Sequence, residues 1–254
     1  MQSSENLQSS NKARPVPHSR IVLAWSLRIC LVVVILGLFS WGWTVLRDPW
    51  KFPVKSVQIV GNFQQIDQTE LKQLILPFVG QGFFALPVTT LRHQLLESPW
   101  VDEVVVKRIW PATVVIDIVE QVPVAHWGKE SLLNAKATLF SPQNAEAVTG
   151  LPILDGPRGQ QKMVLEAYIK MGQTLAKLNL KIVHLTMTPR HAWQLVLDNN
   201  LEIMLSKADA LSRLERFVEV YPQLKQAQNK EAAYVDLRYA NGISIRWQEN
   251  NKVK

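Results

Sequence analysis

An apolar run near the N-terminus limits what this chain can fold into more than any other feature. Residues 29–46 read ICLVVVILGLFSWGWTVL and contain no charged side chain. At a rise of about 1.5 Å per residue, the run covers most of a hydrocarbon core about 30 Å thick, and residues 21–27 extend it. The sequence therefore predicts one membrane-spanning helix over residues 21–46.

A removable signal peptide is the alternative interpretation, because such a peptide would occupy the same position. A cleavage site needs small residues just after the apolar stretch, whereas Phe39, Trp41 and Trp43 stand there. The length of the run and these residues favour a retained anchor. Tryptophans at this place are also typical of the aromatic belt at a membrane surface.

The charges beside the run predict its orientation. Against a single early acid, Glu5, the basic residues that precede or enter the run are Lys12, Arg14, Arg20 and Arg28. By the positive-inside rule the N-terminus is cytoplasmic, and everything after Trp50 lies outside the cytoplasm. Residues 1–20 are polar and cannot build a core, which predicts a disordered cytoplasmic tail.

Composition limits the part that follows the anchor. A chain of 254 residues leaves room for about two small domains of roughly 100 residues each. Its lone cysteine, Cys30, falls inside the apolar run, so packing rather than disulfides must hold the exported part together. The net charge of +7 is spread without basic runs, which argues against nucleic-acid binding.

Hydrophobic periodicity predicts a first exported domain over residues 54–122. Its expected elements are a strand over 54–60, a helix from an N-cap at Asp67 to Pro77, a helix over 89–97, and strands over 101–109 and 113–120 with a turn at Trp110-Pro111 between them. The order β-α-α-β-β predicts a small sheet with two helices on one face.

A second exported domain is expected over residues 123–248, mostly antiparallel β with helices. Its expected strands are 124–128, 132–140 with a turn at Asn134, 151–156, 181–186, 193–198 and 201–205. One helix covers 162–178, and another starts at a capping box of Ser206 and Asp209. The last element is a hairpin of residues 234–239 and 243–247 that turns at Asn241-Gly242, before a polar tail over 249–254.

Several short motifs occur in an order typical of a known family. They are Val57-Gln-Ile-Val-Gly61, Gly80-Gln-Gly-Phe-Phe84, Ser98-Pro-Trp-Val101, Arg108-Ile-Trp-Pro111, Ile118-Val-Glu-Gln-Val-Pro-Val-Ala-His-Trp127 and Tyr234-Val-Asp-Leu-Arg-Tyr239. The first domain resembles a POTRA domain, and the chain from the anchor to Trp247 resembles the FtsQ/DivIB cell-division family. The resemblance implies an α+β protein with one transmembrane helix, a POTRA domain and an FtsQ-type β domain.

The resemblance also implies a function. It predicts an essential, single-pass inner-membrane scaffold at the division septum that links early divisome proteins to late ones. It would bind an FtsB/FtsL-type complex and so help to control septal peptidoglycan assembly. The partner-binding positions that the resemblance implies are Arg190, Arg238, Tyr239, Asn241, Gly242 and Trp247.

A physical reason supports the last hairpin as the binding site. A C-terminal strand often lies at a sheet edge, where free N–H and C=O groups can pair with an incoming strand. Arg238 would then hold a partner carboxylate, and Tyr239 would anchor the contact. The alternative is that Tyr239 and Trp247 only cover the sheet and that Arg238 is solvated.

The residues do not indicate catalysis. The histidines, His18, His93, His126, His184 and His191, lack metal-ligand spacing, and neither a nucleophile elbow nor a phosphate-binding loop occurs. Asp102 and Glu103 are adjacent on a predicted strand, so they are expected to point to opposite faces. We predict no enzymatic activity, cofactor, metal or small-molecule substrate. A POTRA-bearing envelope transport or assembly component and an anchored cell-wall enzyme remain the alternatives.

Overall fold

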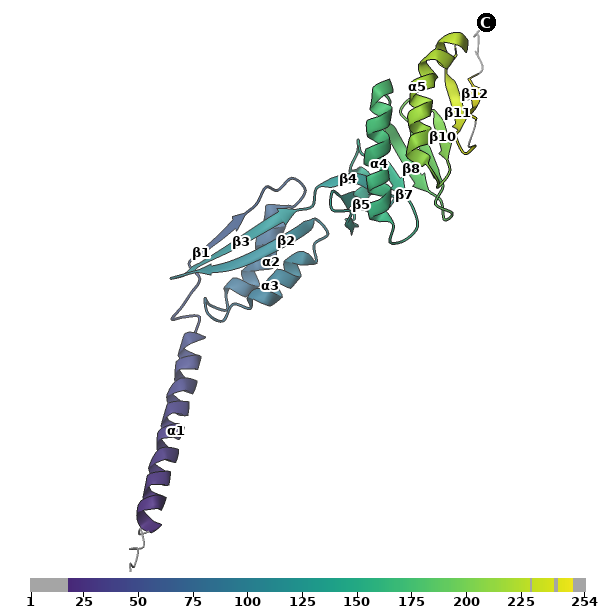
Figure 1. The fold of residues 1–254 in the computed structure, drawn as a ribbon. Coiled ribbons are helices and arrows are strands. Elements are labelled where there is room, and N and C mark those ends of the chain that lie inside the picture. The colour runs from purple at the N-terminus through teal and green to yellow at the C-terminus, as the bar shows by residue number, and fades with distance from the viewer. Residues whose placement is uncertain (1–17, 229, 240–241, 249–254) are drawn as a thin grey trace, which may run out of the picture. The chain divides into compact units, whose positions relative to one another are not determined.

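The computed structural model describes residues 18–228, 230–239 and 242–248 (Figure 1). It opens with helix α1, His18–Leu46. Within the described residues, the segment Arg28–Leu46 of this helix is the one stretch that is long and apolar enough to cross a membrane. The described residues pack into two compact units. The first unit contains the described residues up to Ile59 together with residues 72–91 and 106–116. The second unit contains residues 60–71, 92–105 and 117–248.

A small α+β region follows the helix. Its elements are β1 (Ser56–Val60), α2 (Gln68–Val79), α3 (Val88–Leu96), β2 (Val101–Ile109) and β3 (Thr113–Glu120). The strand order is β1-β3-β2, and Figure 1 shows both helices on one face of this sheet. The predicted β-α-α-β-β order is confirmed. Its buried apolar side chains lie at helical spacing on α2 and α3 and at alternate positions along β3, as in Val114, Ile116 and Ile118.

The predicted cap of α2 is present, but its predicted end is wrong. Asp67 Oδ1 accepts the backbone N–H of Thr69 at 2.7 Å, which satisfies one of the free donors of the first turn. The helix passes through Pro77 and ends at Val79. Gly80 N still donates to Leu76 O at 3.4 Å, so the helix continues past the proline, although the missing N–H of Pro77 removes one hydrogen bond of the last turns.

Glu120, at the end of β3, holds the loop after β1 in place. Its carboxylate accepts the backbone N–H groups of Gln64 and Gln65, each at 2.6 Å, and of Ile66 at 2.9 Å. We expect Glu120→Ala to lower the free energy of unfolding by roughly 1–2 kcal/mol, because hydrogen bonds to a charged group are replaced by bonds to water. Thermal unfolding of the variant beside Glu103→Ala, whose exposed side chain meets only Lys136, measures this; equal stability of the two would contradict it.

The second region is built on one large sheet. Its strands are β4 (Pro123–Trp127), β5 (Ser131–Asn134), β6 (Leu139–Phe140), β7 (Ile153–Asp155), β8 (Ile182–Met187), β9 (Trp193–Leu197), β10 (Glu202–Leu205), β11 (Ala232–Asp236) and β12 (Ser244–Trp247). Their order across the sheet is β12-β11-β10-β9-β8-β7-β4-β5-β6. Most neighbours run antiparallel, as predicted, while β7 is parallel to β4 and β8, and β10 is parallel to β11.

Two helices cover one face of this sheet, α4 (Gln161–Leu175) and α5 (Ala210–Gln228), as Figure 1 shows. The core between helices and strands is apolar, and its largest fully buried side chain is Phe217 of α5. Phe217 packs on Tyr221 with a distance of 4.8 Å between ring centroids. The helix that was predicted over residues 162–178 is present as α4 and a following 3₁₀ turn, Ala176–Leu178.

Two local predictions in this region are wrong. Helix α5 begins at Ala210, not at Ser206, whose hydroxyl donates to Ala208 O instead of capping the helix. Asp209, with a left-handed backbone (φ 56°), separates Ser206 from the first turn. The final hairpin exists, but its first strand ends at Asp236, which pairs with Ser244, and not at Tyr239 as predicted, while Asn241 of the predicted turn lies outside the described residues.

Candidate partner-binding site

Strand β12 is an edge of the large sheet, so one side of it has no strand beside it among the described residues. It pairs with β11 in antiparallel register, with Tyr234 opposite Arg246 and Asp236 opposite Ser244. The Arg246 guanidinium lies over the Tyr234 ring, 5.2 Å from its centroid, which fixes the two strands to each other on that face. The edge of β12 therefore offers an ordered row of backbone groups to an incoming strand.

The topology brings the predicted site residues to one end of the sheet. Gln194 at the start of β9 pairs with Met204 near the end of β10, which in turn pairs with Asp236 at the end of β11. Arg190, just before β9, therefore lies at the same end as Arg238, just after β11. Neighbouring strands are about 4.8 Å apart, so the two backbones are separated by roughly two strand spacings. The sequence indicated both residues, but it did not indicate that they lie at the same end of the sheet.

Arg238 is engaged within the chain rather than solvated. Its Nε donates to Asp236 Oδ1 at 2.9 Å and to Oδ2 at 3.1 Å, and its Nη2 donates to Oδ2 at 2.6 Å. Asp236 is buried and also accepts the backbone N–H of Arg238 at 2.9 Å. The role of Arg238 as a charged clamp for a partner carboxylate stays a prediction. Such a partner would find a guanidinium that is already held in one orientation and half exposed.

A second arginine fixes the backbone at this point. Arg213 of α5 donates from Nη1 to the carbonyl oxygens of Leu237 at 3.1 Å and Arg238 at 2.5 Å. These bonds, with the Asp236 pair, draw the chain away from the ladder after Asp236 and explain the end of β11 at that residue. The Nε of Arg213 is buried and has no hydrogen-bond partner among the described residues. No sequence pattern marks Arg213 or Asp236 as a functional residue. The partners of Arg213 lie on another element, and Arg238, the partner of Asp236, lies in a segment that was expected to be a strand.

The ion pair gives the hairpin a pH dependence. The hydrogen bonds from the Arg238 side chain lower the pKa of Asp236, although its burial acts in the opposite direction. A lowered carboxyl pKa adds stability above the ordinary value of about 4, and this stability is lost as the pH falls through the lowered pKa. We expect Asp236→Asn to be less stable than the parent at pH 6, and the difference to shrink below about pH 4. Thermal unfolding from pH 6 to pH 2.5 measures it, and a constant difference would contradict it.

A cavity of about 260 Å³ lies beside the edge strand, between α5 and the hairpin connection. Its lining combines two arginines and one glutamate with mostly apolar residues: Arg213, Arg216, Glu219, Val220, Leu237, Tyr239, Gly242 and Ile243. Tyr239 is 62% exposed at its rim. This combination suits a partner segment that carries an apolar side chain and a carboxylate next to it.

The other predicted residues have mixed positions. Gly242 is exposed, with open space around its Cα, so a partner backbone could approach it closely. Trp247 is half-buried and packs against the core, as the covering interpretation expected. Asn241 lies outside the described residues. Tyr239 and Gly242 thus border the cavity, whereas Trp247 supports the edge strand from its inner face.

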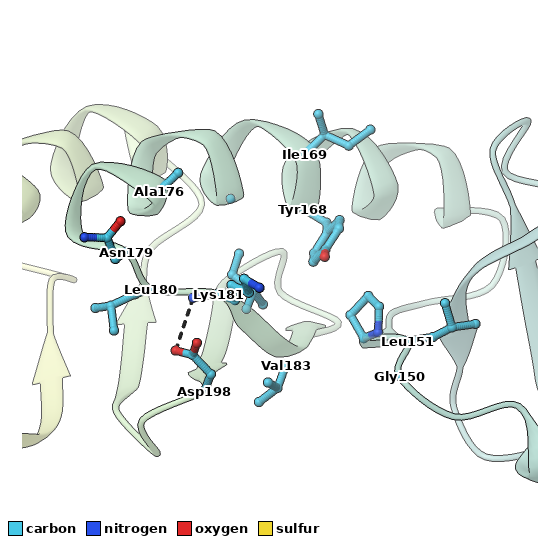
Figure 2. A pocket seen from close by; sticks show the side chains of 13 residues that line it. Gly150, Leu151, Tyr168, Ile169, Ala176, Asn179, Leu180, Lys181, Val183 and Asp198 are labelled. Carbon is cyan, nitrogen blue, oxygen red and sulfur yellow. Dashed lines mark hydrogen bonds between the residues drawn. The ribbon is translucent and has the colours of Figure 1, made fainter.

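A larger cavity, about 780 Å³, lies elsewhere and carries little chemistry. Figure 2 shows Tyr168 reaching from α4 toward the start of β8, and the Lys181 backbone N–H donating to Asp198 at 3.2 Å. The rest of the lining is almost entirely apolar. It therefore holds a single paired carboxylate and one lysine rather than a set of acid, base and nucleophile.

One polar cluster resembles a catalytic triad only in composition. His184 Nε2 lies 2.8 Å from Asp155 Oδ2 and 3.2 Å from Thr186 Oγ1. In a catalytic triad, the acid contacts one ring nitrogen of the histidine and the nucleophile contacts the other. Here both contacts are made by Nε2. Among the residues searched, 18–228, 230–239 and 242–248, no group of three His, Cys, Asp or Glu side chains could hold a metal ion. The absence of enzymatic activity stays a prediction.

The expected separation of Asp102 and Glu103 is wrong. Both carboxylates meet Lys136 Nζ, at 2.8 Å and 2.9 Å. The burial pattern of β2 departs from strict alternation here, because Val101 and Val104, three residues apart, are both buried. These hydrogen bonds raise the pKa of Lys136, so it stays charged at all ordinary pH values. The two acids thus hold a structural cation within the second unit.

The chain matches the family described as the FtsQ-type POTRA domain over residues 52–121 and the C-terminal domain of cell division protein FtsQ/DivIB over residues 125–238. It is 34% identical to cell division protein FtsQ of Escherichia coli, over 85% of this chain and 82% of the relative. It is also 31% identical to FtsQ of Coxiella burnetii, over 86% of this chain and 92% of the relative. The chain belongs to the FtsQ/DivIB family of cell division proteins. The C-terminal match ends at Arg238, so Tyr239 and the edge strand of this FtsQ-family protein lie beyond it.

Proposed function

We propose that this FtsQ-family protein is a membrane-anchored scaffold of the divisome that captures a strand of an FtsB/FtsL-type partner along the free edge of β12. The observation that carries the proposal is the combination of an ordered edge strand with an adjacent cavity lined by arginines and apolar groups. The edge would supply affinity through backbone hydrogen bonds. The cavity would supply selectivity by accepting one apolar and one acidic side chain.

The preset arginines support this interpretation. Arg238 is oriented by buried Asp236, and Arg213 fixes the backbone that leads to Tyr239. Because these groups are ordered before a partner arrives, binding loses less conformational entropy than it would with a mobile loop. The two arginines that line the cavity, Arg213 and Arg216, also select against partners that carry a basic residue next to them.

The membrane helix supports the scaffold role. With the N-terminus cytoplasmic and both folded regions outside, the edge of β12 would meet partners that are anchored in the same inner membrane. Confinement to one membrane raises the effective concentration of the partners, so interfaces of modest affinity suffice. Through this assembly the protein would link early to late division proteins at the septum and help to control peptidoglycan synthesis.

Hydrogen exchange of the full chain in nanodiscs tests strand capture directly. In an antiparallel edge strand, alternate N–H groups point outward, so an added strand should slow exchange at alternate residues of Ser244–Trp247. We expect at least tenfold slower exchange there when a peptide from the FtsB-type partner is added. Protection of other strands with β12 unchanged would overturn the proposal.

A second test is location: an N-terminal fluorescent fusion should form a midcell band during constriction, whereas an even envelope signal would favour a transport or assembly role.

A further inference from the structure

A large aromatic side chain stands exposed at the tip of the β2–β3 hairpin. Trp110 is 77% exposed and its neighbour Ile109 is 51% exposed. Burial of a tryptophan side chain removes a large apolar area from water, so an ordered tip that leaves it in solvent is an interaction surface rather than a packing accident. The strand-capture proposal makes no use of this tip.

The hairpin tip is held next to the end of the membrane helix by hydrogen bonds. Ala112 O accepts the backbone N–H of Lys55 at 2.9 Å and of Ser56 at 3.3 Å. Arg108 Nη2 also donates to Leu86 O, which braces the last residues of β2. The tip is therefore fixed to the chain segment that leaves the anchor.

That segment is short and partly coiled. Lys51 and Phe52 both donate to Asp48 O at 3.2 Å, so the chain continues to turn for several residues after Leu46. Only residues 52–55 can be extended, and they span roughly 10 Å at about 3.5 Å per residue. The bonded hairpin tip consequently lies within reach of the headgroup layer that would surround the end of the anchor.

The connection is also stiff. Phe83 N donates to Phe52 O at 2.8 Å, and the Phe52 and Phe84 rings meet edge to face with 5.1 Å between centroids. Gly82 has φ +92°, and a Cβ there would stand 2.9 Å from Pro49 Cα. The linker therefore docks closely on the Gly82 turn and cannot swing the hairpin tip freely away from the anchor.

The charge around the tip fits an anionic membrane. In residues 47–59 and 106–116, Asp48 is the only acidic residue, while the basic ones are Arg47, Lys51, Lys55, Lys107 and Arg108. The Arg47 guanidinium lies over the Trp43 ring, 4.7 Å from its centroid, and Trp50 is 93% exposed. Aromatic rings flanked by basic side chains are the usual composition of a protein surface that rests in a membrane interface.

We propose that the hairpin tip, Ile109 and Trp110, inserts into the outer interface of the membrane that holds the anchor, with anionic phospholipid headgroups around its lysines and arginines. The protein would then contact the bilayer at two places, the helix and the tip, which fixes how the first exported region stands on the membrane. The inference rests on the membrane anchoring in the proposed function, and continuity with the anchor favours lipid over a protein partner at this surface.

Fluorescence quenching by lipids tests the proposal with the full chain in nanodiscs of phosphatidylcholine and phosphatidylglycerol. The native protein labelled at Cys30 reports the anchor through quenching by a lipid with a nitroxide deep in its acyl chain. Two Cys30→Ser variants carry one new cysteine each, Lys107→Cys near the tip and Glu215→Cys at an exposed position of α5 in the other unit. A nitroxide on the lipid headgroup quenches the label at each position. We expect at least twofold stronger quenching at position 107 than at 215, and loss of that difference with Trp110→Ser.

The controls separate the two proposals. Val105→Ser removes an exposed apolar side chain from the same strand but away from the tip, and should leave quenching at position 107 unchanged. If the label at Cys30 is quenched while the labels at positions 107 and 215 are quenched equally and weakly, the proposed membrane contact of the tip is wrong. The proposed membrane anchor is then still supported. Absence of quenching at Cys30 would overturn the anchor and the tip contact together. Strong quenching at 107 that survives Trp110→Ser would overturn the role of Trp110.

Discussion

Tyr239→Ala is expected to weaken capture of an FtsB-type partner peptide by about 10- to 100-fold, which corresponds to ~1.4–2.8 kcal/mol. Tyr239 stands at the rim of the cavity between α5 and the hairpin and is mostly exposed, so the alanine variant loses partner contacts rather than core packing. Its free energy of unfolding should change by less than about 0.5 kcal/mol. Titration of the full chain in nanodiscs with the labelled peptide measures the affinity, and thermal unfolding measures the stability.

Two further variants sharpen this result. Tyr239→Phe keeps the aromatic ring and should keep most of the affinity. Removing everything from Tyr234 onward would be a poor test, since β11 is an inner strand and its Val235 is fully buried. A chain that stops before Ile243 loses only the edge strand and should fail to bind while retaining β11. Unchanged affinity in Tyr239→Ala would remove this residue from the site.

Phe217→Ala is expected to lower the free energy of unfolding of the second region by about 3–5 kcal/mol. Phe217 is fully buried on α5 and packs on Tyr221, so the alanine variant leaves a cavity in the middle of the core. Such a loss is a large part of the total stability of a typical domain. Denaturant unfolding, followed by tryptophan fluorescence to which buried Trp193 contributes, measures it.

The control for this core substitution lies one turn farther along the same helix. Val220 is partly exposed, so Val220→Ala should cost less than about 1 kcal/mol although it removes apolar atoms from the same element. Similar losses in both variants would show that Phe217 does not occupy a closely packed position. Membrane insertion should be equal in both, because the anchor lies in a separate part of the chain.

The reliable sequence predictions rest on local patterns. The apolar run predicted α1, because its length and lack of charge leave few other structures. The strands Val101–Ile109 and Thr113–Glu120 occur at the predicted residues, since alternation and a Trp-Pro turn define both ends. The cap at Asp67 was also predictable, as it depends on residues within one turn of the chain.

The predictions that failed depend on backbone conformations and side-chain contacts that the short sequence pattern does not contain. Ser206 fits a capping box, but a left-handed backbone at Asp209 moves the helix start to Ala210. Asn241-Gly242 fits a tight hairpin, but the bonds of Asp236 with Arg238 and of Arg213 with the backbone after it end the ladder early.

By itself, the amino-acid sequence determined the apolar N-terminal helix, the order of the elements and the family, because each depends on residue types in a continuous stretch. The tertiary structure alone decided that β12 is an edge, that Arg190 and Arg238 share one end of the sheet, and that Arg238 is held by a buried carboxylate. It also decided that the Trp110 turn is bonded to the segment after the anchor. These facts arise from strand order and long-range contacts, which are selected by the packing of the whole core rather than by any local pattern.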